Sequence, residues 1–220
     1  MMTIDRKHIC RAFAAYAARY DDTNPKIRLK IDHTYRVAAL CDEISQSLAL
    51  SSADCDLAWV IGMLHDVGRF EQVRRYNTFS DADSVDHAAL GVELLFEKGL
   101  IRDYLPDAHW DGLIRRAIAS HCLYPLPAGL SQRELLFCKL IRDADKIDIL
   151  KANCLTPMEE IYATTAEQLH KAAITPAVLN AFYEQHTVLR SLRKTSIDHL
   201  ISLLSLVYEL EFPISLQIVH

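Results

Sequence analysis

The chain has 220 residues, half of them hydrophobic, and a formal net charge of −5. This length suits one hydrophobic core, so a single domain spanning residues 1–220 is expected. The acidic balance gives no general attraction to a polyanionic backbone, and the lysines and arginines are scattered along the chain. Stable nucleic-acid binding is therefore not expected.

The apolar segments are too interrupted or too short for export or membrane insertion. Charged residues break up positions 1–20, and the most apolar run, 197–210, is shorter than the about 20 residues that a membrane span requires. None of the six cysteines forms a CxxC pair, so they are expected to be buried, reduced thiols. They are Cys10, Cys41, Cys55, Cys122, Cys138 and Cys154. We expect a cytoplasmic protein with no membrane attachment.

Apolar residues recur at intervals of three and four through most of the chain, and alternating runs typical of strands are few. This pattern predicts an all-α fold, a single-domain helical bundle. The helices expected in chain order cover residues 5–20, 30–49, 54–67, 84–98, 108–121, 132–151, 157–170, 176–185 and 187–210. Those after residue 157 are expected to pack on a motif-bearing core of about residues 30–150.

Local signals place several helix ends and loops. Ser131 and Glu134 have the spacing of a capping box at a helix start. Gly68 is expected to be the C-cap of the helix that ends at residue 67. A long, charged loop would follow over residues 69–83, and a second loop with two prolines is expected over residues 123–129.

Six polar side chains interrupt the apolar stripes of these predicted helices or adjoin them. They are His33, His65, Asp66, His87, His121 and Asp145. Imidazole nitrogens and carboxylate oxygens are costly in an apolar interior unless they are paired or bound to metal. Each histidine alone also fits a core residue bonded to a backbone carbonyl. Six inward residues spread over five predicted helices indicate a shared site for divalent metal.

The order His33, His65-Asp66 and Asp145 resembles the signature of the HD superfamily of metal-dependent phosphohydrolases, over about residues 30 to 150. The resemblance implies that metal-activated hydroxide cleaves a phosphoester, of a nucleotide or a related small phosphate. It further implies that the four signature residues hold one ion and that Asp66, as a catalytic residue, bridges to a second. His87 and His121 would complete the second ion, as in HD members that bind two metals.

The resemblance has limits that bear on the substrate. The HD-GYP cyclic-dinucleotide phosphodiesterases carry a His-His pair where this chain has His121-Cys122, and the Gly-Tyr-Pro motif is replaced by Leu123-Tyr124-Pro125. Cyclic dinucleotides are therefore not the expected substrate. The ligand set, free of thiolates, suits Mn²⁺, Fe²⁺, Mg²⁺, Co²⁺ or Zn²⁺ without choosing among them.

Two basic residues are candidates for substrate binding. Arg69 lies where related proteins place a basic residue, and its guanidinium suits phosphate oxygens, although a surface salt bridge with Glu71 is an equal alternative. Lys146 could assist from beside Asp145 or could be a solvated helix lysine.

The final metal ligand has two candidates on one helix. Asp143 and Asp145 are separated by about 200° of helical rotation, so both cannot point at the metals. Apolar periodicity does not distinguish them. By the resemblance, Ala144-Asp145-Lys146 has the register of the HD signature, which assigns the role to Asp145.

Two other functions fit the same residues. A di-iron oxygenase of the myo-inositol oxygenase type would use the same six ligands, and a regulatory HD module would keep the fold without catalysis. The identity of the phosphorylated substrate and the oligomeric state stay open.

Overall fold

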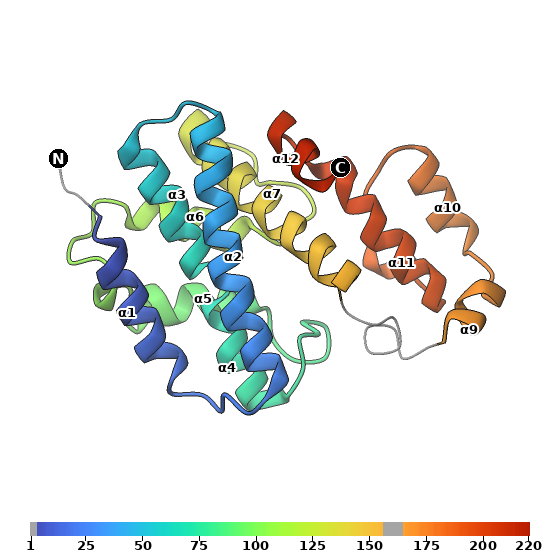
Figure 1. Ribbon diagram of the computed structural model, residues 1–220, viewed down its shortest axis with the longest axis horizontal. Helices are drawn as coiled ribbons and strands as arrows, with labels where there is room; N and C mark the ends of the chain where they lie inside the picture. Colours follow the sequence, from blue (N-terminus) through green and yellow to red (C-terminus); the bar gives the residue numbers. More distant parts are fainter. Residues whose placement is uncertain (1–3, 156–164) are drawn as a thin grey trace. The chain divides into compact units, whose positions relative to one another are not determined.

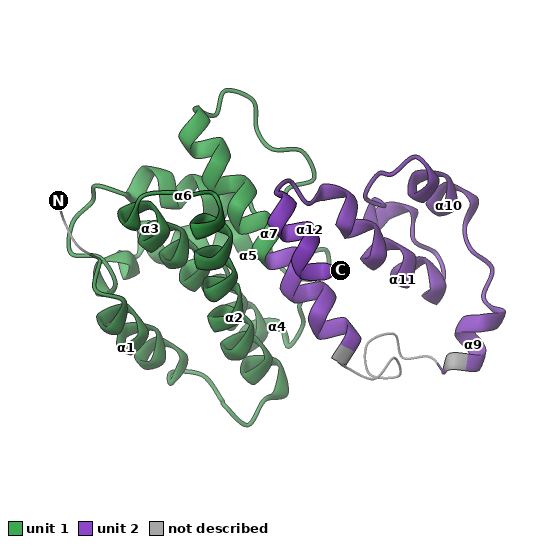
Figure 2. Cartoon of the chain, turned by 45° about the horizontal axis from the view of Figure 1, so that its top comes forward, with its two compact units in different colours: residues 1–144 green, residues 145–220 purple. Residues whose placement is uncertain are grey.

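A computed structural model describes residues 4–155 and 165–220 of the chain (Figure 1). These residues form helices and loops with no strand among them, which confirms the all-α prediction. They divide into two compact units, Met1–Ala144 and Asp145–His220, coloured separately in Figure 2. The single-domain organisation stays a prediction. None of the helices in the described ranges combines the length and apolar character needed to cross a lipid bilayer.

The first unit consists of helices and short helical turns joined by loops. Its elements are α1 (Arg6–Ala17), α2 (Pro25–Ser47), α3 (Ser52–Leu64), α4 (Val67–Tyr76), α5 (His87–Val92), the π-helical turn η1 (Glu93–Glu97), the 3₁₀ turn η2 (Leu100–Asp103), α6 (Asp111–Ser120) and the start of α7 (Gln132–Leu155). The boundary between the units falls within α7. Ser131 and Glu134 form the predicted reciprocal cap at the start of α7.

Helix α3 lies at the centre of the first unit. Every residue from Leu57 to Leu64 is buried, because α3 is apolar around its whole circumference and other helices cover it. Helix α2 lies alongside α3, and α1 and α6 also pack against it (Figure 1). Side chains of Asp5, Asn24 and Ser51 cap the starts of α1, α2 and α3 by accepting bonds from backbone N–H groups. The packed helices give a fixed frame for polar residues at their ends.

The chain breaks its helical path between α3 and α4. Leu64 ends α3, Asp66 has non-helical backbone angles (φ −111°, ψ 17°), and Val67 begins α4. The predicted helix over residues 54–67 is therefore wrong at its end, and the predicted loop over 69–83 is wrong up to Tyr76, where α4 ends. Apolar periodicity continues across the break, so the pattern alone did not reveal it.

Gly68 is not a C-cap, contrary to the prediction, and lies in the first turn of α4. Its missing side chain lets α4 approach α5 closely. A Cβ on Gly68 would lie 2.2 Å from the His87 carbonyl oxygen and 2.7 Å from the Gly91 nitrogen. The glycine therefore sets the distance between the helix that follows Asp66 and the helix that begins with His87.

The second unit contains shorter helices after the end of α7. Its elements are α9 (Ala166–Lys171), α10 (Pro176–Tyr183), η3 (Arg190–Leu192), α11 (Ser196–Leu204), η4 (Ser205–Glu209) and α12 (Pro213–Val219). Buried Asp198 accepts hydrogen bonds from Thr175 and from the backbone N–H groups of Lys194 and Thr195. These bonds tie the start of α10 to the start of α11.

Other predictions for the C-terminal part need correction. The helix expected over residues 187–210 is divided into η3, α11 and η4, and α12 was not predicted. Most of the helix expected over 157–170 lies outside the described residues, which include only α9 from it.

Cys122 and Cys154 are exposed, so the prediction of buried thiols is wrong for both.

Substituting Gly68 by alanine tests the close approach of α4 to α5. The new Cβ would collide with backbone atoms, which cannot rotate away as a flexible side chain can. We expect Gly68→Ala to lower the free energy of unfolding by about 1–3 kcal/mol, the usual cost of overpacking. Urea denaturation measures this change.

Gly91→Ala is the matched control on the facing helix. Its Cβ would meet the Gly68 nitrogen at 3.4 Å, an ordinary contact, and alanine favours a helix over glycine by about 1 kcal/mol. This variant should be neutral or slightly more stable. Equal destabilisation by the two substitutions would show that Gly68 has no special steric role.

Candidate metal centre

Four histidines and one aspartate from different helices converge on one buried point of the first unit. His33 lies on α2, His65 and Asp66 occupy the break between α3 and α4, His87 begins α5, and His121 follows α6. All five side chains are buried, with 0–4% of their surface exposed. The structure therefore brings together five of the six predicted ligands.

The two carboxylate oxygens of Asp66 face different pairs of imidazoles. Oδ2 lies 3.5 Å from the Nε2 atoms of both His33 and His65. Oδ1 lies 3.5 Å from Nε2 of His87 and 3.8 Å from Nε2 of His121. Each oxygen and its two nitrogens form a separate donor set, and Asp66 joins the sets.

The other nitrogen of three imidazoles is held by a hydrogen bond. Nδ1 of His65 lies 2.7 Å from the Gly62 carbonyl oxygen, and Nδ1 of His121 lies 2.7 Å from that of Ile118. Nδ1 of His87 lies 2.7 Å from Oδ2 of Asp81. Because these oxygens accept hydrogen bonds, each Nδ1 is assigned the proton, and a neutral ring then presents an unprotonated Nε2 to the centre.

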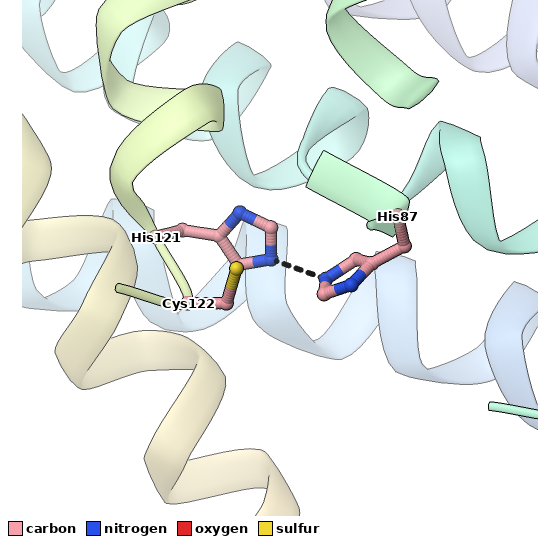
Figure 3. A group of neighbouring side chains, drawn as sticks. All are labelled: His87, His121 and Cys122. Carbon is pink, nitrogen blue, oxygen red and sulfur yellow. Dashed lines mark hydrogen bonds between the residues drawn. The ribbon is translucent and has the colours of Figure 1, made fainter. Parts of the chain in front are cut away.

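This arrangement fits bound metal. Nε2 atoms lie 3.2 Å apart in the His33–His65 pair and 3.1 Å apart in the His87–His121 pair, the latter drawn in Figure 3. A hydrogen bond between two Nε2 atoms needs a proton on one of them, and the protons of His87 and His121 are both assigned to Nδ1. Nitrogens bound to one ion at about 2.1 Å lie about 3 Å apart when their bonds meet near a right angle. A divalent cation at each pair would satisfy both nitrogens and one oxygen of Asp66.

Lys30 supplies positive charge to the carboxylate and was not predicted as a site residue. It lies one turn before His33 on α2, and its Nζ donates to Oδ2 of Asp66 over 2.6 Å. Burial alone would raise the pKa of Asp66, but the charge of Lys30 lowers that pKa well below its usual value. Asp66 is therefore an ionised carboxylate ready to bind a cation.

Arg69 is buried beside this centre. Its Nη1 donates to Gln72, to the Phe79 carbonyl oxygen and to Oδ1 of Asp81 over 2.7–2.8 Å. Its Nε has no hydrogen-bond partner among the described residues and lies 3.7 Å from Oδ1 of Asp66. The alternative of a surface salt bridge between Arg69 and Glu71 is wrong, because Arg69 is buried and Glu71 pairs with arginines at 74 and 75.

Asp81 contacts both His87 and Arg69, and it is the second site residue, after Lys30, that was not predicted from the sequence. One oxygen holds Nδ1 of His87, and the other accepts from Arg69 and Gln72. Burial raises the pKa of Asp81, but its hydrogen bond with His87 and the charge of Arg69 lower that pKa below the usual value. A carboxylate on the far nitrogen of a ligand histidine fixes the ring and raises its basicity. Asp81 therefore positions both His87 and Arg69.

The remaining predicted residues lie on α7. Asp143 is fully buried in the first unit, and Asp145, half-buried, begins the second unit. The role of Asp145 as a ligand stays a prediction. Lys146 is buried rather than solvated, and its Nζ pairs with Glu209 of the same unit over 2.9 Å. Its role toward substrate also stays a prediction.

The first unit is all-helical, and within it four imidazoles surround one ionised carboxylate. This combination of fold and donor groups is typical of metal-binding helical proteins. The sequence matches the HD domain family over residues 31–150, and the chain belongs to this family of metal-dependent phosphohydrolases.

One curated relative extends the comparison. The chain is similar to 3′3′-cGAMP-specific phosphodiesterase 1 of Vibrio cholerae, with 24% identity over 174 residues. The similarity covers 74% of this chain and 36% of the relative, so the chain spans about a third of that protein's length. No solved structure matches the chain significantly.

Replacing Asp81 by asparagine tests its positioning role. The amide keeps the size of the side chain but loses the charge that orients the His87 ring, so metal affinity should fall by about 10- to 100-fold. Calorimetric titration of the metal-free protein with Mn²⁺ measures the change. Asp83→Asn on the same loop is the matched control, because Asp83 is exposed and bonds only Ser80 among the contacts described. Equal affinities of the two variants would contradict the assignment.

Proposed function

We propose that this protein is a hydrolase that uses a dinuclear metal centre to cleave a phosphoester of a nucleotide or a related small phosphate. The proposal rests on the position of the Asp66 carboxylate between two pairs of histidines. One of its oxygens faces His33 and His65, and the other faces His87 and His121. A carboxylate placed in this way suits a bridge between two ions. Membership of the HD domain family supports the same reaction.

The metal ions and the side chains that hold them would have different roles in the proposed reaction. Bound divalent ions would supply Lewis acidity, which lowers the pKa of a water molecule and neutralises charge on a phosphoryl group. The imidazoles keep Nε2 toward the centre because backbone carbonyls and Asp81 hold Nδ1. In the hydrolysis, the oxygen of water bonds to phosphorus, the P–O bond to the leaving alcohol breaks, and the alcohol oxygen gains a proton.

Two cationic side chains favour a phosphate substrate over a neutral one. Lys30 and Arg69 both lie beside Asp66, and both also lie within 6 Å of the Phe79 ring centre. When cations occupy the centre, the lysine ammonium is no longer required as the counter-charge of Asp66 and can contact phosphate oxygens. The planar guanidinium of Arg69 suits the same oxygens.

The relative points to the kind of phosphate. A protein named as a 3′3′-cGAMP-specific phosphodiesterase acts on a cyclic dinucleotide, so a phosphodiester of nucleotide size is a reasonable first substrate to test. Cys122 and Leu123-Tyr124-Pro125 differ from the HD-GYP pattern, so a cyclic dinucleotide itself is not the expected substrate.

Hydrolysis should require metal and proceed without oxygen. We expect purified protein loaded with Mn²⁺, Co²⁺ or Ni²⁺ to release product from at least one member of a phosphoester and nucleotide panel, and chelation to abolish the release. Elemental analysis should approach two ions per chain. No turnover of any phosphoester, together with oxygen consumption on a polyol, would replace this proposal with the oxygenase alternative.

The choice between Asp143 and Asp145 can be tested directly. Asp145→Ala should lose metal and activity, because it removes the last ligand proposed for the first ion. Asp143→Ala should keep its metal and reduce activity or stability by a smaller amount, as expected for an outer contact with an effect of about 10- to 100-fold. Elemental analysis of both variants measures the difference, and metal loss confined to Asp143→Ala would reverse the assignment.

A further inference from the structure

A cysteine lies next to the His87–His121 half of the centre. One nitrogen of His87, one nitrogen of His121 and the sulfur of Cys122 all lie within 4.8 Å of one another (Figure 3). With bonds of about 2.3 Å for Zn–S and 2.1 Å for Zn–N, tetrahedral coordination places the sulfur about 3.6 Å from each nitrogen. A closer approach of about 1 Å would therefore let the three side chains coordinate the same ion.

The backbone around Cys122 is held in place on both sides. His121 is fixed by the bond between its Nδ1 and the Ile118 carbonyl oxygen. After Cys122, the Leu123 N–H bonds the Ser120 carbonyl, and the Arg142 guanidinium of α7 donates to the Leu123 and Tyr124 carbonyls. The position of the sulfur next to the imidazoles thus follows from an anchored turn rather than a free loop.

The two halves of the centre differ in chemistry. The group formed by His33, His65 and Asp66 offers nitrogen and oxygen donors, whereas the group at His87 and His121 adds a sulfur. Thiolate is a soft ligand that favours Zn²⁺ and other thiophilic ions, and carboxylate with imidazole also accepts harder ions. The sequence-based expectation of a thiolate-free ligand set did not include this donor.

We propose that the thiolate of Cys122 is a ligand of the ion held by His87 and His121, and that this position takes a thiophilic divalent cation such as Zn²⁺. The inference rests on the metal centre of the proposed function but not on its hydrolytic reaction. Binding forms a metal–sulfur bond and releases the thiol proton to solvent, with no change of oxidation state.

Cobalt substitution tests the sulfur ligand without an activity assay. Metal-free, full-length protein titrated with Co²⁺ should develop a thiolate-to-cobalt charge-transfer band in the near ultraviolet. Cys122→Ser should lose the band and weaken Zn²⁺ binding at one position by about tenfold or more, since even outer-shell changes cost 10- to 100-fold. Cys122→His should keep two bound ions without the band, because imidazole replaces sulfur.

Cys154→Ser is the matched control, because Cys154 is also an exposed thiol but belongs to the second unit. It should keep the band. Cobalt binding without the band in the wild-type protein, or a band that survives in Cys122→Ser, would overturn the sulfur ligand while leaving the proposed reaction intact. Failure to bind cobalt at all would overturn both proposals, whereas the band in a protein inactive on every phosphoester would support this inference and contradict the reaction alone.

Discussion

The interaction on which the site depends is the compensation of one buried negative charge. An ionised carboxylate inside a protein is strongly unfavourable unless positive charge and hydrogen bonds surround it. Asp66 is 3% exposed, and around it stand the Lys30 ammonium, the Arg69 guanidinium and four imidazoles. Divalent cations compensate such a charge more effectively than one ammonium does. Metal binding therefore offsets the free energy that burial of the Asp66 carboxylate costs, and this favours a high metal affinity.

The helical architecture can be understood as the means of holding these groups. The break between α3 and α4 releases Asp66 from helical geometry at the centre of the unit. Gly68 then allows α5 to approach, which brings His87 to the carboxylate. Asp81 completes the arrangement by holding His87 and Arg69 with its two oxygens. Packing, backbone geometry and charge thus act on the same few residues.

Sequence reasoning identified the all-α fold and the five polar residues that converge in the first unit, because polar residues within apolar stripes require a partner. It failed where tertiary contacts overrule local pattern. Gly68 has the usual position of a C-cap, yet its role is to admit a neighbouring backbone. Asp81 was missed because nothing in a charged loop marks one carboxylate as the partner of His87. Lys30 could have been found, since a residue one turn from His33 lies on the same helix face.

The central claim is that Asp66 joins two cation positions, each completed by a pair of histidines. Anomalous diffraction from crystals of the cobalt-loaded protein would locate the ions directly. Two peaks about 3.5–4 Å apart are expected, one on each side of the Asp66 carboxylate, as in dinuclear hydrolases. Cobalt bound away from Asp66, or a single peak at saturating cobalt, would contradict the bridging role of Asp66.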